Sequence, residues 1–295
     1  MNRKTKQIVL PLIAAMIWGS AFVAQKSGAE VLGAFTFTGT RYLLAALALV
    51  CFLLIRGKYT RQRPFSANRS ALLRGGLVMG TLLAVASNLQ QYGVGLTSAG
   101  KAGFITTLYI VLVPLFGLFL HKRVRVPVWC GVAVALAGLY LLSFAAGGEM
   151  SFTMGDLCVL LCAIVFSCHI LAVDYFTKFA DAVELACLQF VVAAVESLLC
   201  ALVTEGVAVD AIRAAAFPIF YAGVISGGIA YTLQIVSQKD GDPAVVSLLL
   251  SLESFFAALS GAIILHERLS LREYFGCALM LCAVVLVQLP EKKAS

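Results

Sequence analysis

The chain has 295 residues, of which 61% are hydrophobic and only 13% are charged, with a formal net charge of +7. Its charged share is about half that of an average soluble domain, so an aqueous fold cannot bury its apolar surface and the lipid bilayer must act as its solvent. The excess positive charge lies mostly between Arg56 and Arg74, which predicts a loop near anionic lipid headgroups and excludes nucleic-acid binding.

Ten apolar stretches are long enough to cross a bilayer as helices, which takes roughly 17 to 25 residues each. Seven stretches contain no Asp, Glu, Lys or Arg, at 7–25, 75–100, 102–120, 126–148, 157–173, 214–238 and 274–290. Three more contain one charge each: 31–55 holds Arg41, 185–204 holds Glu196 and 243–266 holds Glu253. The two-residue alternation of a membrane barrel strand is absent, and lipid leaves helices as the remaining way to satisfy the backbone. We predict spans at 8–25, 32–55, 72–93, 99–120, 126–146, 155–176, 184–203, 215–237, 243–265 and 271–290. The first is interpreted as a retained span, because no small-residue cleavage site follows it.

Helix starts are marked by capping residues. Asp242 and Pro243 form an N-cap followed by proline at the ninth span, and Ser270 with Glu273 forms a capping-box pattern at the tenth. Thr97 takes the position that matches Asp242 and is expected to cap the fourth span. Glycine pairs spaced four apart, at 76 and 80 and at 223 and 227, predict close helix approach in the third and eighth spans.

The chain is duplicated. Residues 98–143 align with residues 243–288 at a constant offset of 145, and an offset of 148 places Trp18 on Phe166 and Arg41 on Gln189. Because each half has five spans, an odd number, the second half must cross the membrane upside down relative to the first. The predicted fold is therefore an all-α integral membrane bundle of ten transmembrane helices in two inverted five-helix repeats, 8–146 and 154–290. Such repeats are typical of membrane carriers whose site lies at the repeat interface.

The basic residues predict the orientation. An N-terminus inside the cell places 16 of the 22 Lys and Arg residues on the cytoplasmic side and 5 outside, with Arg41 in the membrane. This bias follows the positive-inside rule. We expect a multi-pass protein of the cell membrane with both termini in the cytoplasm.

Several short motifs, in order and in both halves, carry a family resemblance. They are Trp18-Gly19-Ser20-Ala21-Phe22, Arg41-Tyr42, Thr97-Ser98-Ala99-Gly100, and the run from Leu252-Glu253-Ser254 through Glu267-Arg268-Leu269 to Gly276. Together they resemble the EamA-type family of the drug/metabolite transporter superfamily over nearly the whole chain. The resemblance implies a ten-helix basket that exports amino acids, related metabolites or drugs through a central cavity. One departure is Phe166-Ser167-Cys168, which stands where a second aromatic-Gly-Ser motif would match the first, so we expect an asymmetric site.

Ionisable residues inside the spans are the first site candidates, since a charge at mid-membrane costs roughly 2.5 to 3.5 kcal/mol on insertion scales and tends to face the bundle interior. Glu253 lies near mid-span, where a carboxylate in a low dielectric can exchange a proton near neutral pH. Arg41 could anchor a substrate carboxylate. The alternative is a structural pair of Arg41 with Glu253 or Glu196. His169 is either a proton relay or a hydrogen-bonded helix contact.

Amide and phenol groups gather near the ends of the third and eighth spans, which are repeat counterparts. They are substrate contacts if they face inward, or interhelical hydrogen bonds otherwise. The full set of candidate substrate-binding residues is Trp18, Arg41, Asn88, Gln91, Tyr92, Tyr109, His169, Tyr231, Gln234 and Glu253, with Glu253 and His169 as the proton-coupling candidates.

Other function classes are disfavoured. The sequence has no H-E-x-x-H or G-x-S-x-G motif, so we expect no enzyme, and its nine cysteines lie in apolar spans without a His or carboxylate cluster, so we expect no metal site and no cofactor. The expected partners are a small-molecule substrate, membrane lipid and protons. The alternative function is a passive membrane channel or a non-transporting membrane adaptor.

Overall fold

The computed structural model describes residues 3–60, 68–97, 99–122, 124–143, 153–206, 208–239, 241–264 and 270–288, and these residues form helices joined by short connections. The helices are α1 (Arg3–Ala29), α2 (Ala34–Thr60), α3 (Arg69–Leu96), α4 (Ala99–Thr107), α5 (Tyr109–Phe119), α6 (Val126–Ser143), α7 (Met154–Phe176), α8 (Ala182–Thr204), α9 (Val209–Ala214), α10 (Ala216–Phe220), the π-helix η1 (Tyr221–Tyr231), α11 (Thr232–Gln238), α12 (Pro243–Leu250), α13 (Glu253–Ile264) and α14 (Leu271–Gln288). Predicted features at 61–67, 98, 144–152, 265–269 and 289–295 lie outside the described residues.

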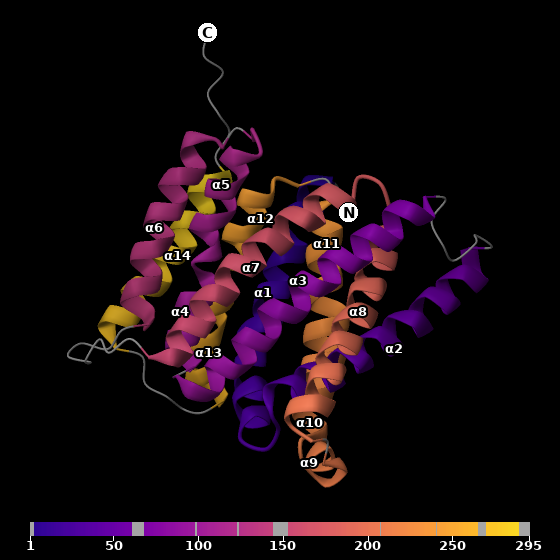
Figure 1. The fold of residues 1–295 in the computed structure, drawn as a ribbon. Helices are drawn as coiled ribbons and strands as arrows, with labels where there is room; N and C mark the ends of the chain where they lie inside the picture. Colours follow the sequence, from indigo (N-terminus) through magenta and orange to yellow (C-terminus); the bar gives the residue numbers. More distant parts are fainter. Residues whose placement is uncertain are drawn as a thin grey trace.

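The ten predicted spans correspond to helical segments of this bundle. By length and composition, eight segments of the described chain can cross a membrane, and α6 adds a shorter apolar helix over Val126–Leu141. The tenth predicted span is α14. The helices run alternately up and down, so that α1 begins and α14 ends at the same end of the bundle, opposite α9 (Figure 1).

The helix contacts repeat between the two halves. α3 packs on α7 and α8, and the counterpart of α3, the η1 segment, packs on α1 and α2. The pairs α2 with α8 and α6 with α14 join repeat counterparts to each other. This pseudo-two-fold pattern confirms the predicted fold of two inverted five-helix repeats.

The fourth and ninth spans are each broken in the middle, although the sequence predicted continuous helices. The breaks lie at Leu108, between α4 and α5, and at Ser251 and Leu252, between α12 and α13. At both places the backbone forms hydrogen bonds between residues three apart, as in a 3₁₀-helix, for example from Leu108 N to Ile105 O and from Leu252 N to Leu249 O. The hydroxyls of Thr107 and Ser251 also bond back to carbonyls of their own preceding turn, a contact that bends helices.

The predicted caps hold with one exception. The Asp242 side chain accepts from Ala244 N at 2.8 Å, ahead of Pro243. Ser270 and Glu273 bond reciprocally, as a capping box does. The prediction for Thr97 was wrong, because Thr97 closes α3 and its hydroxyl donates to Asp156 Oδ1 at 2.9 Å.

Glycines set the closest helix contacts. A Cβ added at Gly80 would lie 2.5 Å from Val192, and one at Gly223 would lie 2.6 Å from the Arg41 carbonyl oxygen, which confirms close approach at both predicted glycine pairs. Gly19 makes a similar close contact with Glu253, since a Cβ added at Gly19 would lie 2.6 Å from the Glu253 carbonyl oxygen. Gly223 and Gly19 thus each let a helix of one half reach the backbone of a charged residue in the other half.

Gly19→Ala is expected to destabilise the bundle by about 1–3 kcal/mol, because the new methyl meets rigid backbone on α13 that cannot move aside. The measurement is the thermal unfolding midpoint of the purified protein in detergent. Gly103→Ala is the matched control, since its Cβ would meet only Ser254 Oγ at 3.8 Å. Equal midpoints for the two variants would contradict the close contact.

Candidate functional site

A cavity lies between the two repeats, at the level of the helix breaks. The cavity is narrow, with about 40 Å³ of free volume, and it receives side chains from the described helices of both halves. The lining residues are Trp18, Phe22, Gln25, Arg41, Gln90, Thr106, Tyr109, Phe166, Ile170, Ser226, Tyr231, Gln234, Leu250 and Glu253.

Arg41 brings a buried positive charge to this cavity. Its side chain is 4% exposed, and its guanidinium carbon lies 4.7 Å from the ring centroid of Tyr42 and 5.6 Å from that of Phe37. Nη2 donates to Tyr42 Oη at 3.4 Å, while Nε is buried without a hydrogen-bond partner. Aromatic faces therefore compensate part of the charge, and guanidinium donors remain for an anion.

Neither of the two anticipated structural pairs is formed. Within the described part of the chain no carboxylate lies within 4 Å of Arg41. Glu253 bonds to other groups, and Glu196 accepts from Thr81 Oγ1 at 2.7 Å. Arg41 is thus an intramembrane cation whose counter-charge is not supplied by the described residues.

Glu253 occupies the junction of the two broken spans. It is the first residue of α13, and its Oε1 accepts from Tyr109 Oη at 3.2 Å and from Thr107 Oγ1 at 3.5 Å. Thr107 also contacts Ser254 Oγ at 2.9 Å, so that the two breaks are hydrogen-bonded to each other. A helix N-terminus favours a carboxylate at this place.

Aromatic side chains form one wall of the cavity. Trp18 and Tyr231 pack with their ring centroids 4.6 Å apart, and Trp18 Nε1 donates to Ser226 O at 3.2 Å across the α1–η1 contact. Phe22, Phe166 and other apolar lining residues complete the wall. The cavity therefore presents a cation, a carboxylate and an apolar surface to whatever enters it.

Six of the ten predicted site residues line this cavity, namely Trp18, Arg41, Tyr109, Tyr231, Gln234 and Glu253. The other four lie outside the lining. Asn88 Nδ2 donates to Ser197 Oγ at 2.8 Å, Gln91 Nε2 donates to Gln25 O at 2.9 Å, and His169 Nε2 lies 2.9 Å from Gln189 Oε1. Tyr92 is 53% exposed on the outer surface. The side chains of Asn88, Gln91 and His169 therefore form hydrogen bonds between helices.

Sequence reasoning missed several lining residues. Gln90 directly precedes the predicted Gln91, and its Nε2 donates to Thr106 Oγ1 at 3.3 Å. Because the two residues are adjacent, they lie on different faces of α3, and only Gln90 lines the cavity. Phe166 was detectable as the repeat counterpart of Trp18. Gln25 carried no signal beyond being an amide in an apolar span. No cluster of three His, Cys, Asp or Glu residues that could hold a metal ion occurs in the described ranges.

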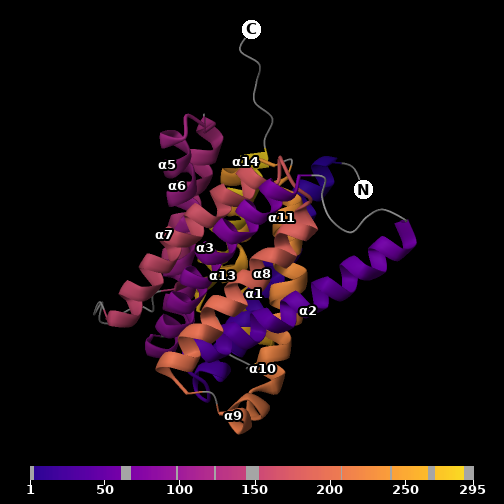
Figure 2. The same ribbon diagram turned by 45° about the vertical axis from the view of Figure 1, so that its right-hand side comes forward.

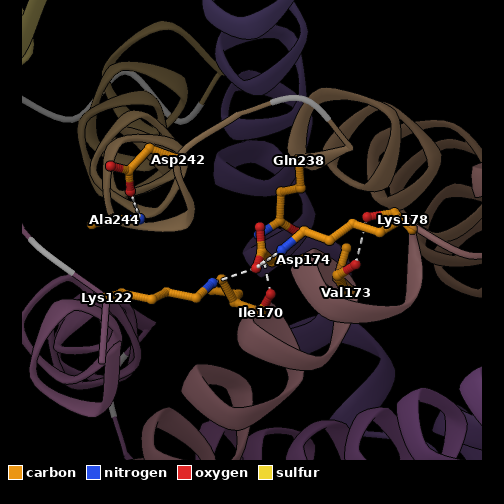
Figure 3. A network of polar contacts seen from close by, with 9 residues as sticks. Lys122, Ile170, Val173, Asp174, Lys178, Gln238, Asp242 and Ala244 are labelled. Atoms are coloured by element: carbon orange, nitrogen blue, oxygen red, sulfur yellow. Dashed lines mark hydrogen bonds and ion pairs between the residues drawn. The ribbon is translucent and has the colours of Figure 1, made fainter. Parts of the chain in front are cut away.

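A polar cluster ties together the helix ends at the side of the bundle where α1 begins (Figure 3). Lys122 and Lys178 both pair with the buried Asp174, the latter at 3.1 Å. Next to it, Gln238 Nε2 donates to the carbonyl of Ile170, which lines the cavity, at 3.3 Å. The cluster therefore stands about one helical turn beyond the cavity and connects the ends of α5, α7 and α11 there.

Two buried serines offer a test of the cavity. In a cysteine-free background, Ser226→Cys is expected to react with a small water-soluble methanethiosulfonate, because Ser226 lines the cavity. Ser167→Cys is the matched control: Ser167 is also buried, but it lies outside the lining and bonds to Ala163 O. Labelling is measured by mass spectrometry. Equal labelling at both positions would contradict this placement of the cavity.

Known proteins resemble this chain, most of them over nearly its whole length and one over about half of it. A solved crystal structure superimposes with a TM-score of 0.78 at 20% identity and covers 96% of both chains, which establishes a shared fold. An uncharacterized transporter of Archaeoglobus fulgidus is 29% identical, with 94% of this chain and 84% of that protein aligned. The uncharacterized transporter YoaV of Bacillus subtilis is 22% identical over 95% and 96% of the two chains. The uncharacterized inner membrane transporter YedA of Escherichia coli is 31% identical over 48% of this chain and 46% of its own.

The family model of the EamA-like transporters matches residues 5–144 and 153–289, which together span both repeats. This match agrees with the motifs in both halves, the inverted ten-helix fold and the cavity at the interface of the repeats. The chain belongs to the EamA-like transporter family and is a multi-span membrane transporter.

Proposed function

We propose that this transporter exports amino acids or related small metabolites and drugs across the cell membrane by alternating access. The observation that carries the proposal is that two opposite charges line one cavity without contacting each other: Arg41, which has no counter-carboxylate among the described residues, and Glu253. A zwitterion that carries both a carboxylate and an ammonium group matches this pair. A neutral solute would leave the buried guanidinium without an anion, which is costly in a low dielectric.

The lining residues then take distinct roles. Arg41 anchors the substrate carboxylate through its free donors, and Glu253 accepts the substrate ammonium group or exchanges a proton during the cycle. The aromatic wall around Trp18 and Tyr231 holds the apolar part of the substrate. Glu253 is the stronger proton-coupling candidate, because it lines the cavity whereas His169 bonds to Gln189 outside it.

The two repeats, 8–146 and 154–290, are the units that move against each other in this proposal. The broken spans meet at Thr107 and Ser254, where few main-chain bonds need to change during a rocking motion. Alternating access also requires the Lys122–Asp174 ion pair, which joins the two repeats, to separate whenever the cavity opens toward that end of the bundle. The relationship to YedA, an inner membrane transporter, supports the cell membrane as the location.

The transport test uses purified protein in liposomes loaded with an amino-acid and metabolite mixture, scored for release with and without a pH gradient. Arg41→Gln and Glu253→Gln are each expected to lower the release of the transported compounds at least about tenfold. Each variant loses one charge pair between the protein and the substrate, and removing one partner of a buried charge pair costs on the order of 2 kcal/mol or more. Glutamine keeps hydrogen bonding and removes the charge.

Matched controls remove exposed charges. Arg213→Gln and Asp210→Asn change an exposed ion pair in α9 and should leave the flux at the wild-type level. Release that rises linearly with concentration, without saturation or stimulation by counter-substrate, would indicate a passive channel. No release at all would favour a non-transporting adaptor.

Topology is testable separately. Reporter fusions and cysteine labelling in whole cells should place the 56–74 loop and the C-terminus in the cytoplasm and the 147–154 loop outside. The reason is that Arg56, Arg74, Lys122 and Lys178 all lie near the bundle end where α1 begins. By the positive-inside rule, the end of a membrane protein that carries more Lys and Arg faces the cytoplasm. A C-terminus on the outside would contradict the orientation and the even number of spans.

A further inference from the structure

A second recess lies on the outer surface of the bundle, apart from the central cavity. α8 packs between α2 and α3, and α2 leans away from the other helices toward its C-terminal end (Figure 2). Near the N-terminal end of α2, the three helices enclose a groove of about 320 Å³ that is lined by apolar side chains such as Phe35, Val85 and Leu89. It shares no lining residue with the central cavity. Val85 and Tyr92 are about half exposed there, so in a membrane the groove faces lipid.

Glu196 places a carboxylate in this groove. It lies three residues from Ala193, the midpoint of α8, which is only about 4–5 Å along the helix axis at 1.5 Å per residue. An ionised side chain at such depth, on a lipid-facing surface, is costly and marks a functional site unless the protein neutralises it.

The other carboxylates on α8 and at its C-cap have partners. Glu184 lies 3.7 Å from an Arg56 nitrogen. Glu205 accepts hydrogen bonds from Phe35 N and Thr36 N, at 2.9 and 2.8 Å, and thereby caps α2. Glu196 receives only the Thr81 hydroxyl, and no Lys or Arg of the described chain lies within 4 Å of it.

Asn88 is a second polar residue that lines the groove. Asn88 is 9% exposed, and its Oδ1 has no hydrogen-bond donor, although its Nδ2 is bonded to Ser197. Because Asn88 Oδ1 is enclosed by the protein, the groove itself combines an apolar wall with one carboxylate, Glu196, that has no cationic partner among the described residues. Its complement is a molecule with one positive charge and a large apolar body.

We infer that this groove binds a lipophilic cation that enters from the bilayer, with Glu196 as its counter-ion. The volume suits a drug-sized molecule, whose usual pockets hold roughly 300 to 1,000 Å³. The apolar body contacts Phe35, Val85 and Leu89 while the charge lies against Glu196. This site is separate from the central cavity and does not depend on the proposed amino-acid export.

The rival interpretation is that the Glu196–Thr81 bond only joins α8 to α3. A glutamine would accept the same hydrogen bond, so that interpretation predicts no effect of removing the charge. Glu196→Gln therefore separates the two, and Glu253→Gln asks whether a cation binds in the central cavity instead.

The experiment measures equilibrium binding of tetraphenylphosphonium to the purified full-length protein in lipid nanodiscs. Wild type and Glu253→Gln should bind it with the same affinity, and Glu196→Gln should bind at least about tenfold more weakly, because it loses a charge–charge contact in an apolar groove. Unchanged affinity of Glu196→Gln, loss confined to Glu253→Gln, or no binding to wild type would each overturn the inference.

A steric variant keeps the test decisive if Glu196→Gln folds poorly. Val85→Trp fills the groove without altering any charge and should also weaken binding at least about tenfold. Leu199→Trp is its control, since Leu199 is exposed on α8 but does not line the groove. Equal affinities of these two variants would also overturn the inference.

Discussion

The architecture of this transporter depends on one constraint: the hydrocarbon core of a bilayer supplies no hydrogen-bond partner and no counter-ion. Polar groups inside the spans must be met by the protein or by a ligand. Thr107 and Tyr109 meet Glu253, and the faces of Phe37 and Tyr42 meet Arg41. The carboxylate is largely satisfied and the guanidinium is not, which is the basis for our proposal that Arg41 receives an anionic group.

Close backbone approach is what brings these charges together. Gly19 of α1 lies against the carbonyl of Glu253, and Gly223 of η1 lies against the carbonyl of Arg41. Each contact joins a helix of one repeat to a charged residue of the other. A side chain on either glycine would push the corresponding helices apart, so the packing motif and the candidate site are parts of one arrangement.

The repeats have diverged where chemistry is concentrated. The counterpart of Arg41 is Gln189, which bonds to His169, and the counterpart of Trp18 is Phe166, which has no indole donor. Fold symmetry is thus preserved in the helix contacts, while among the described residues the cavity has one cation, Arg41, on one side. A zwitterionic substrate would have one preferred orientation in such a site.

The sequence by itself determined the number of spans, the duplication, its inversion and the caps at Asp242 and Ser270. The free energy of inserting a span is a sum over its residues, and the free energy of a cap depends on a few neighbouring residues, so both can be read from the sequence. Only the tertiary structure decided which way each polar residue faces. Gln90 reaches the cavity lining and Gln91 does not, although they are adjacent, because one residue turns a helix by about 100°. The breaks at Leu108 and Ser251, and the missing partner of Arg41, likewise depend on helices distant in sequence, which no local pattern records.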